Sequence, residues 1–133
     1  MSAEIAGYVG GDANTAEINE KIAEVWTEIL RDPEATAQAA RLLGISPGEL
    51  AARAPAAPFV AKTGQSGLDP VSVTILLFIG GMAADIVKDV VKDEAEKALG
   101  ALWRKFVKPR VENKFGTAHP FGREMSDDDL AGG

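Results

Sequence analysis

The amino-acid sequence predicts an all-α protein, a small helical bundle with disordered termini. Alanine, which has the highest helix propensity, is abundant along the 133 residues. Apolar side chains recur every three or four positions through much of the chain, which is the period of a helix with one buried face. Alternating runs of β-branched residues are almost absent. The exception, residues 71–75, continues directly into Leu-Leu-Phe-Ile, so a helix explains it as well as a strand does.

The first part of the chain divides into a flexible N-terminus and an acidic segment of three helices. Residues 1–13 are small and rich in glycine, which predicts flexibility. Residues 14–54 are expected to form the three helices. The first begins at Asn14 or Thr15, because either side chain can cap it. Its buried face consists of apolar residues at helical spacing, namely Ile18, Ile22, Val25, Trp26, Ile29 and Leu30.

Cap signals define the other two helices of this segment. Asp32 and Pro33 end the first helix and begin the second, as N-cap and first helical residue. Gly44 is expected to end the second helix in the left-handed conformation. Ser46 and Glu49 have the spacing of a capping box, which predicts a third, short helix.

A linker separates this segment from the second half of the chain. Residues 55–69 contain prolines and glycines that are typical of a long loop. Residues 70–116 predict a long helical segment that changes from wholly apolar to amphipathic. We expect a break near Gly80 or Asp93, since an unbroken helix would be too long for so small a protein, and Pro109 should end or kink the last helix.

The residue types of the chain, including those of its tail, argue against a catalytic site. Residues 117–133 are poor in apolar side chains and predict a disordered acidic tail. They include His119, the single histidine, and the chain has no cysteine. A zinc site and a nucleophilic triad both need more of these side chains. No glycine-rich phosphate-binding loop is present. The sequence therefore predicts no catalytic, metal or cofactor site and no enzyme activity.

The composition also indicates which class of partner and which cellular compartment to expect. The net charge of −6 disfavours electrostatic attraction to nucleic acid. The absence of cysteine suits a reducing cytoplasm, and the N-terminus lacks the basic-then-apolar pattern of a signal peptide. We therefore expect a cytoplasmic protein whose partner is another protein.

Residues 71–84 form an apolar run without a single charge. The run is shorter than the about 20 residues that a membrane-spanning helix needs. A buried central helix is the expected interpretation. Membrane insertion and self-association are the alternatives, the second because Gly80 and Ala84 have the spacing that allows close helix contact.

A basic stretch late in the second half is the candidate partner-binding site. Its cations alternate with aromatic residues and are accompanied by one carboxylate, Glu112. Such a stretch can contact nucleic acid, an anionic membrane or an acidic protein, or it can simply stabilise a helix C-terminus. The acidic tail is a candidate intramolecular partner. The predicted binding residues are Trp103, Arg104, Lys105, Lys108, Arg110 and Lys114.

Residues 35–53 resemble the helix-turn-helix motif of bacterial DNA-binding proteins. Ala40, Gly44, Ile45 and Leu50 stand where that motif has a small packing residue, the turn glycine and two core apolar residues. The resemblance implies two short helices joined by a tight turn, with the second helix binding DNA. This second helix departs from the motif, because it offers few of the polar and basic side chains that the family presents to the major groove.

Residues 124–133 resemble the double-glycine ending of bacterial leader peptides, notably those of the nitrile-hydratase-like type. Met125 replaces the usual leucine, and the spacing to the glycines is shorter. In that family a protease cuts after the second glycine and releases a core peptide, so the resemblance implies processing here. No core peptide follows in this sequence, which would make the chain a leader without cargo. The matching residues are Ser126, Asp127, Asp128, Leu130, Gly132 and Gly133.

These observations give one preferred function and three alternatives. We expect a non-catalytic helical interaction or adaptor protein of a bacterial system, acting through the second half of the chain and its tail. The alternatives are a leader-like or Gly-Gly-tailed substrate of a processing or conjugating system, a helix-turn-helix DNA-binding protein, and a membrane-active helix.

Overall fold

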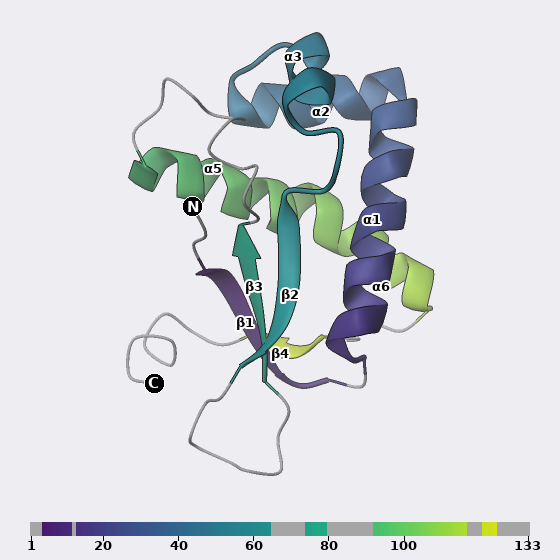
Figure 1. Cartoon of the computed structure of the whole chain (residues 1–133), viewed down its shortest axis with the longest axis vertical. Helices are drawn as coiled ribbons and strands as arrows, with labels where there is room; N and C mark the ends of the chain where they lie inside the picture. Colours follow the sequence, from purple (N-terminus) through teal and green to yellow (C-terminus); the bar gives the residue numbers. More distant parts are fainter. Residues whose placement is uncertain (1–3, 12, 65–73, 80–91, 117–120, 125–133) are drawn as a thin grey trace.

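The computed structural model describes residues 4–11, 13–64, 74–79, 92–116 and 121–124. Within these residues the chain forms a four-stranded antiparallel sheet with helices packed against it (Figure 1). The prediction of an all-α helical bundle is therefore wrong. In chain order, the elements are β1 (Glu4–Gly10), α1 (Thr15–Arg31), α2 (Pro33–Leu43), α3 (Pro47–Arg53), β2 (Phe59–Gly64), β3 (Thr74–Ile79), α5 (Lys92–Leu102), the π-helical turn η1 (Trp103–Val107), α6 (Lys108–Phe115) and β4 (Gly122–Glu124).

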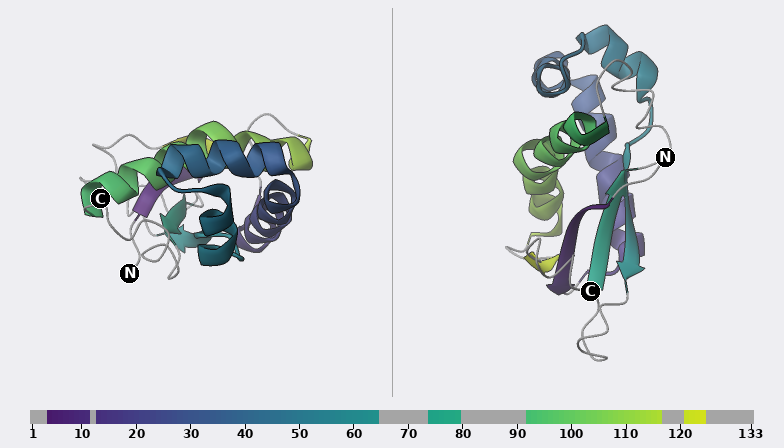
Figure 2. Two further views of the ribbon diagram at one scale, coloured as in Figure 1. Left: turned by 90° about the horizontal axis from the view of Figure 1, so that it is seen from above. Right: turned by 90° about the vertical axis from the view of Figure 1, so that its left-hand side faces the viewer.

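The strands lie in the order β2-β3-β1-β4, and every pair of neighbours is antiparallel. β1 and β2 are connected through α1, α2 and α3, and they lie on either side of β3. β3 and β4 are connected through α5, η1 and α6, and they lie on either side of β1. Two interleaved units of this kind make the β-α-β-β-α-β arrangement known as ferredoxin-like. Figures 1 and 2 show α5, η1 and α6 crossing one face of the sheet, with α1 beside β2.

The apolar run of residues 71–84 contains strand β3 rather than a helix. Ile75, Leu77 and Ile79 are buried at every second position, and Phe78 between them is partly buried. β3 pairs with β2 on one side and with β1 on the other, so it is an interior strand. Interior strands and buried helices both consist of continuous apolar residues, so the hydrophobic pattern could not separate them. The rest of the run lies outside the described residues.

β1 and β4 lie in segments where we expected flexibility and disorder, residues 1–13 and 117–133. The two strands pair with each other, with Tyr8 opposite Glu124, and Tyr8 also lies opposite Ile75 of β3. The small residues of β1 have a weak preference for strands. We infer that its conformation is set by its two neighbours, which local sequence cannot indicate.

β2 lies in the expected linker, residues 55–69, and is tied to α1 through Asn19. The amide Nδ2 of Asn19 donates to the backbone oxygen of Ala61 at 2.9 Å, and its Oδ1 accepts from the Ala61 N–H at 2.8 Å. β2 is an edge of the sheet. Asn19 therefore provides both hydrogen bonds that a further strand would make with Ala61, which protects this edge from pairing with another chain.

The helix caps of the first segment are confirmed. Asn14 caps α1 by accepting from the Glu17 N–H at 2.9 Å, and Asp32 caps α2. Gly44 ends α2 in the left-handed conformation with φ of 72°. The capping box that opens α3 is complete. The predicted apolar face of α1 is buried as well, at Ile18, Ile22, Val25, Trp26 and Ile29.

A continuous helical rod, formed by α5, η1 and α6, comes between β3 and β4 in the chain. In η1 the Lys108 N–H donates to the Trp103 carbonyl, five residues earlier, which is the π-helical pattern. Pro109 follows at once, and it has no N–H to continue an α-helical ladder. We expected Pro109 to end or kink the last helix. The helix does not end at Pro109, but continues to Phe115 and is followed by the left-handed Gly116. The break expected near Gly80 lies outside the described residues, whereas Asp93 is the second residue of α5, which begins at Lys92.

Gly11 tests whether β4 is docked where the structure places it. A Cβ added at Gly11 would lie 2.4 Å from the backbone carbonyl carbon of Phe121, because the two chain segments touch. We expect Gly11→Ala to lower the free energy of unfolding by about 1–3 kcal/mol, measured by urea denaturation with tryptophan fluorescence. Gly48→Ala is the matched control, since nothing lies within 4 Å of its added Cβ. It should leave stability unchanged or raise it by up to about 1 kcal/mol. Equal stability of the two variants would contradict the docking of β4.

Candidate functional site

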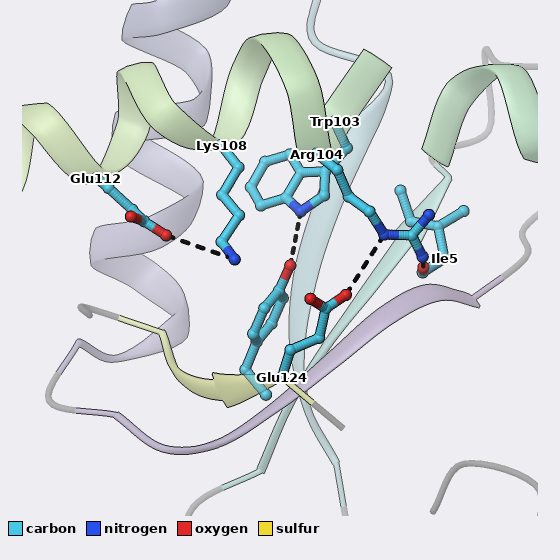
Figure 3. Close-up of polar contacts among 7 residues, drawn as sticks. Ile5, Trp103, Arg104, Lys108, Glu112 and Glu124 are labelled. Atoms are coloured by element: carbon cyan, nitrogen blue, oxygen red, sulfur yellow. Dashed lines mark hydrogen bonds and ion pairs between the residues drawn. The ribbon is translucent and has the colours of Figure 1, made fainter. Parts of the chain in front are cut away.

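Trp103, the aromatic centre of the predicted binding stretch, lies in the core. Its side chain is fully buried, and its indole Nε1 donates to the hydroxyl oxygen of Tyr8 at 2.9 Å (Figure 3). The rings of Phe59 and Phe121 lie with their centroids 5.6 Å and 5.7 Å from that of Trp103. The structure therefore gives Trp103 a packing role and leaves it no exposed surface for a partner.

Arg104, the next residue, reaches the edge of the sheet instead. Its Nη2 donates to the backbone oxygen of Ile5 at 2.8 Å, and its Nε lies 3.4 Å from a carboxylate oxygen of Glu124 (Figure 3). Gly100 leaves room for the guanidinium, since a Cβ there would lie 3.3 Å from Nη1 of Arg104. The side chains of Arg104 and Glu124 remain 49% and 42% exposed. Arg104 is thus held in position and still accessible.

The ammonium group of Lys108 lies over the ring of Tyr8, and Figure 3 shows its ion pair with Glu112. Its Nζ lies 4.9 Å from the centroid of the Tyr8 ring and 3.6 Å from a carboxylate oxygen of Glu112. Only about a quarter of the Lys108 side chain is exposed. Lys108 therefore stabilises the buried Tyr8 through its ammonium group and offers little surface to a partner.

The remaining cations of the stretch have other surroundings. Arg110 packs 4.0 Å from the Phe106 ring and donates to the Phe106 backbone oxygen at 2.9 Å. Lys114 contacts Glu28 of α1 at 2.6 Å, and this hydrogen bond raises the pKa of Lys114. Lys105 is exposed. The basic stretch is therefore distributed over different surfaces, and Arg104 is the member that lies at the β1–β4 edge.

A hollow of about 300 Å³ lies beside Arg104, between the start of β1 and α5. It is lined by two cations, two carboxylates and two residues without charge, and burial raises the pKa of one of the carboxylates, Glu4. The lining residues are Glu4, Ile5, Glu96, Lys97, Gly100 and Arg104. We call Arg104, Lys97 and this hollow the Arg104 site.

Of the two segments that resemble known motifs, residues 35–53 lie within the described residues and most of residues 124–133 lie outside them. α2 and α3 are joined at Gly44 and form the tight helical turn that the helix-turn-helix motif implies. On α3, Arg53 forms an ion pair with Glu49 at 2.9 Å, and DNA binding stays a prediction. The proposed processing residues, Gly132 and Gly133, lie outside the described residues, as does most of the acidic tail.

The described part of the chain also bears on metal binding and on membrane insertion. Among its described residues, no three His, Cys, Asp or Glu side chains gather in a way that could hold a metal ion. None of the helices described there is both long and apolar enough to span a bilayer.

The comparisons with known proteins give no relative. No protein-family model matches the chain, and neither a curated protein nor a solved structure matches it. A fold arrangement alone does not determine function, so the function has to be inferred from the residues of the site.

The Arg104 site contains residues that sequence reasoning missed. Ile5 and Glu4 lie in the segment expected to be flexible, and they are about a hundred positions from Arg104 along the chain. Lys97 and Gly100 lie on the helix before the basic stretch. No local signal connects these residues, because their proximity depends on how the rod crosses β1.

Tyr8 provides a direct test of the buried contact beneath the site. Burial raises the pKa of Tyr8 from 10.0 to about 12. Because the pKa in the folded state lies above that in the unfolded state, the folding free energy that Tyr8 contributes is complete below pH 10 and is lost as the pH rises toward 12. The chain has one tyrosine, so tyrosinate absorbance reports on it alone. We expect the absorbance to appear well above pH 10 in the native protein and near pH 10 in urea. Native protein that titrates near pH 10 with its circular dichroism intact would contradict the burial.

Proposed function

We propose that this protein is a non-catalytic interaction domain that binds an acidic segment of a partner protein at the Arg104 site. The observation that carries the proposal is that Arg104 is both held in position and exposed. Its guanidinium is oriented by the Ile5 carbonyl, yet about half of the side chain is exposed beside a hollow. A pre-oriented guanidinium loses little freedom when it binds a carboxylate, and its planar donors match the carboxylate geometry.

The present partner of Arg104 indicates the chemistry of the ligand. Glu124 offers a carboxylate at 3.4 Å, a long contact between two exposed groups. Ion pairs of this kind contribute at most about 1 kcal/mol, so a second carboxylate can replace or join Glu124 at little cost. Lys97 lines the same hollow and adds a second positive charge.

The surrounding carboxylates favour a short acidic protein segment over nucleic acid. Glu4 and Glu96 line the hollow, and Glu112 lies near Lys108 on the same rod. A continuous polyanion would meet these negative charges as well as the overall charge of −6. A single carboxylate placed at Arg104 avoids them. The cytoplasmic location expected from the absence of cysteine is part of this proposal.

The proposal is tested by the binding of a short fluorescent peptide with one glutamate among serines, measured by anisotropy at low salt. We expect Arg104→Gln to weaken binding about 3-fold to 10-fold, since one exposed charged contact is lost. Arg41→Gln is the control. Arg41 is an exposed arginine at the end of α2 and does not line the hollow, so this variant makes the same change in charge outside the Arg104 site. Binding should weaken as salt is added.

Two results would overturn the proposal. One is an equal loss of affinity in Arg104→Gln and Arg41→Gln, which would show that only the net charge matters. The other is tighter binding to duplex DNA or to anionic vesicles than to the peptide, which would favour the helix-turn-helix or membrane alternative. Circular dichroism of both variants establishes that the fold is retained.

A further inference from the structure

The hollow of the Arg104 site is lined by charges of both signs that have not been paired with one another. Lys97 lines it together with Glu4 and Glu96, and within the described part of the chain no ion pair includes any of these three residues. Burial raises the pKa of Glu4, so the hollow disfavours this unpaired negative charge. A ligand that brings a positive group to the glutamates would relieve that cost.

The charges of opposite sign are separated along the hollow. Glu96, Gly100 and Arg104 follow one another at intervals of four residues, so they lie along one side of the rod. Gly100 leaves the space between the carboxylate and the guanidinium open, since a Cβ there would lie 3.3 Å from Nη1 of Arg104. On β1, Glu4 precedes Ile5, whose carbonyl holds Arg104. The hollow thus offers a guanidinium and two carboxylates to the same ligand.

We propose that the Arg104 site binds a dipolar segment of the partner protein, with a carboxylate on Arg104 and a nearby lysine or arginine side chain on Glu4 and Glu96. This inference rests on the proposed function and specifies the charge pattern of the segment that binds. A guanidinium alone would accept any carboxylate. The two glutamates disfavour a wholly acidic segment and favour one in which a basic residue stands close to the acidic residue.

The positions of the charges restrict the spacing of the two ligand residues. Glu4 is the immediate neighbour of Ile5, to which Arg104 is bound, so the positive side chain has to lie close to the carboxylate. In an extended segment, side chains two positions apart project to the same side and are about 7 Å apart. The preferred segment therefore has an acidic and a basic residue separated by one residue.

Three blocked fluorescent peptides test the proposal with the full-length protein, by anisotropy at low salt. The first is the dipolar peptide Ser-Ser-Glu-Ser-Lys-Ser-Ser. The second replaces its lysine with glutamine, and the third replaces its glutamate with glutamine. Each is made in both sequence orders, and the tighter order is compared. We expect the dipolar peptide to bind about 3-fold to 10-fold more tightly than the second, because it gains a charged contact, and the third to bind most weakly.

A variant with both Glu4→Gln and Glu96→Gln should change the two glutamate-containing peptides in different directions. Binding of the dipolar peptide should weaken about 3-fold to 10-fold, whereas binding of the second peptide should stay unchanged or become tighter, since repulsion is removed. A variant with Glu34→Gln and Glu94→Gln is the matched control. Both of these glutamates are exposed and neither lines the hollow, so the same charge is removed outside the site. Circular dichroism establishes that both variants are folded.

The outcomes separate this inference from the proposed function. If the dipolar peptide and the second peptide bind equally tightly, and the Glu4/Glu96 variant strengthens both, the dipolar ligand is wrong while the binding of an acidic segment stands. If neither glutamate-containing peptide binds, both are wrong. An equal loss of affinity for the dipolar peptide in the Glu34/Glu94 variant would also overturn the inference, because net charge would then explain the effect.

Discussion

The structure depends on one buried hydrogen bond, from the indole of Trp103 to the hydroxyl of Tyr8, 2.9 Å long and joining residues 95 positions apart. It connects the helical rod to the interior strand β1. A buried polar group left without a partner costs about 1–3 kcal/mol, so these two side chains strongly favour a single crossing point of rod and sheet. Phe59 and Phe121 pack around the pair, with ring centroids between 5.3 Å and 5.7 Å from their neighbours.

This contact also positions the candidate site. Successive residues of a helix project in different directions, so Arg104 points toward the edge of β1 while Trp103 is buried. The π turn begins at Trp103, and within it Trp103, Phe106 and Val107 are buried while Arg104 and Lys105 stay on the surface. π turns inside α-helices occur frequently at functional sites, and this one lies beneath the Arg104 site. The packing that buries Trp103 in the core therefore also sets the orientation of Arg104.

The sequence indicated part of the candidate site. It indicated a basic stretch around Arg104 and the absence of any metal-binding or nucleophilic motif, because residue type alone decides those questions. It also grouped Trp103 and Lys114 with Arg104, whereas the structure places Trp103 in the core and Lys114 against Glu28 of α1. Residues adjacent in sequence face different neighbours once a helix is packed, so composition could not show which cation lies at the sheet edge.

The sequence by itself determined the helix caps at Asn14, Asp32 and Gly44 and the buried face of α1, because these features depend on hydrogen bonds and spacing within a few residues. Only the tertiary structure decided that residues 74–79 form a strand and that the glycine-rich start of the chain is an interior strand. A strand gains its hydrogen bonds from partners far along the chain, so the same apolar or small residues carry no local signal until those partners are in place.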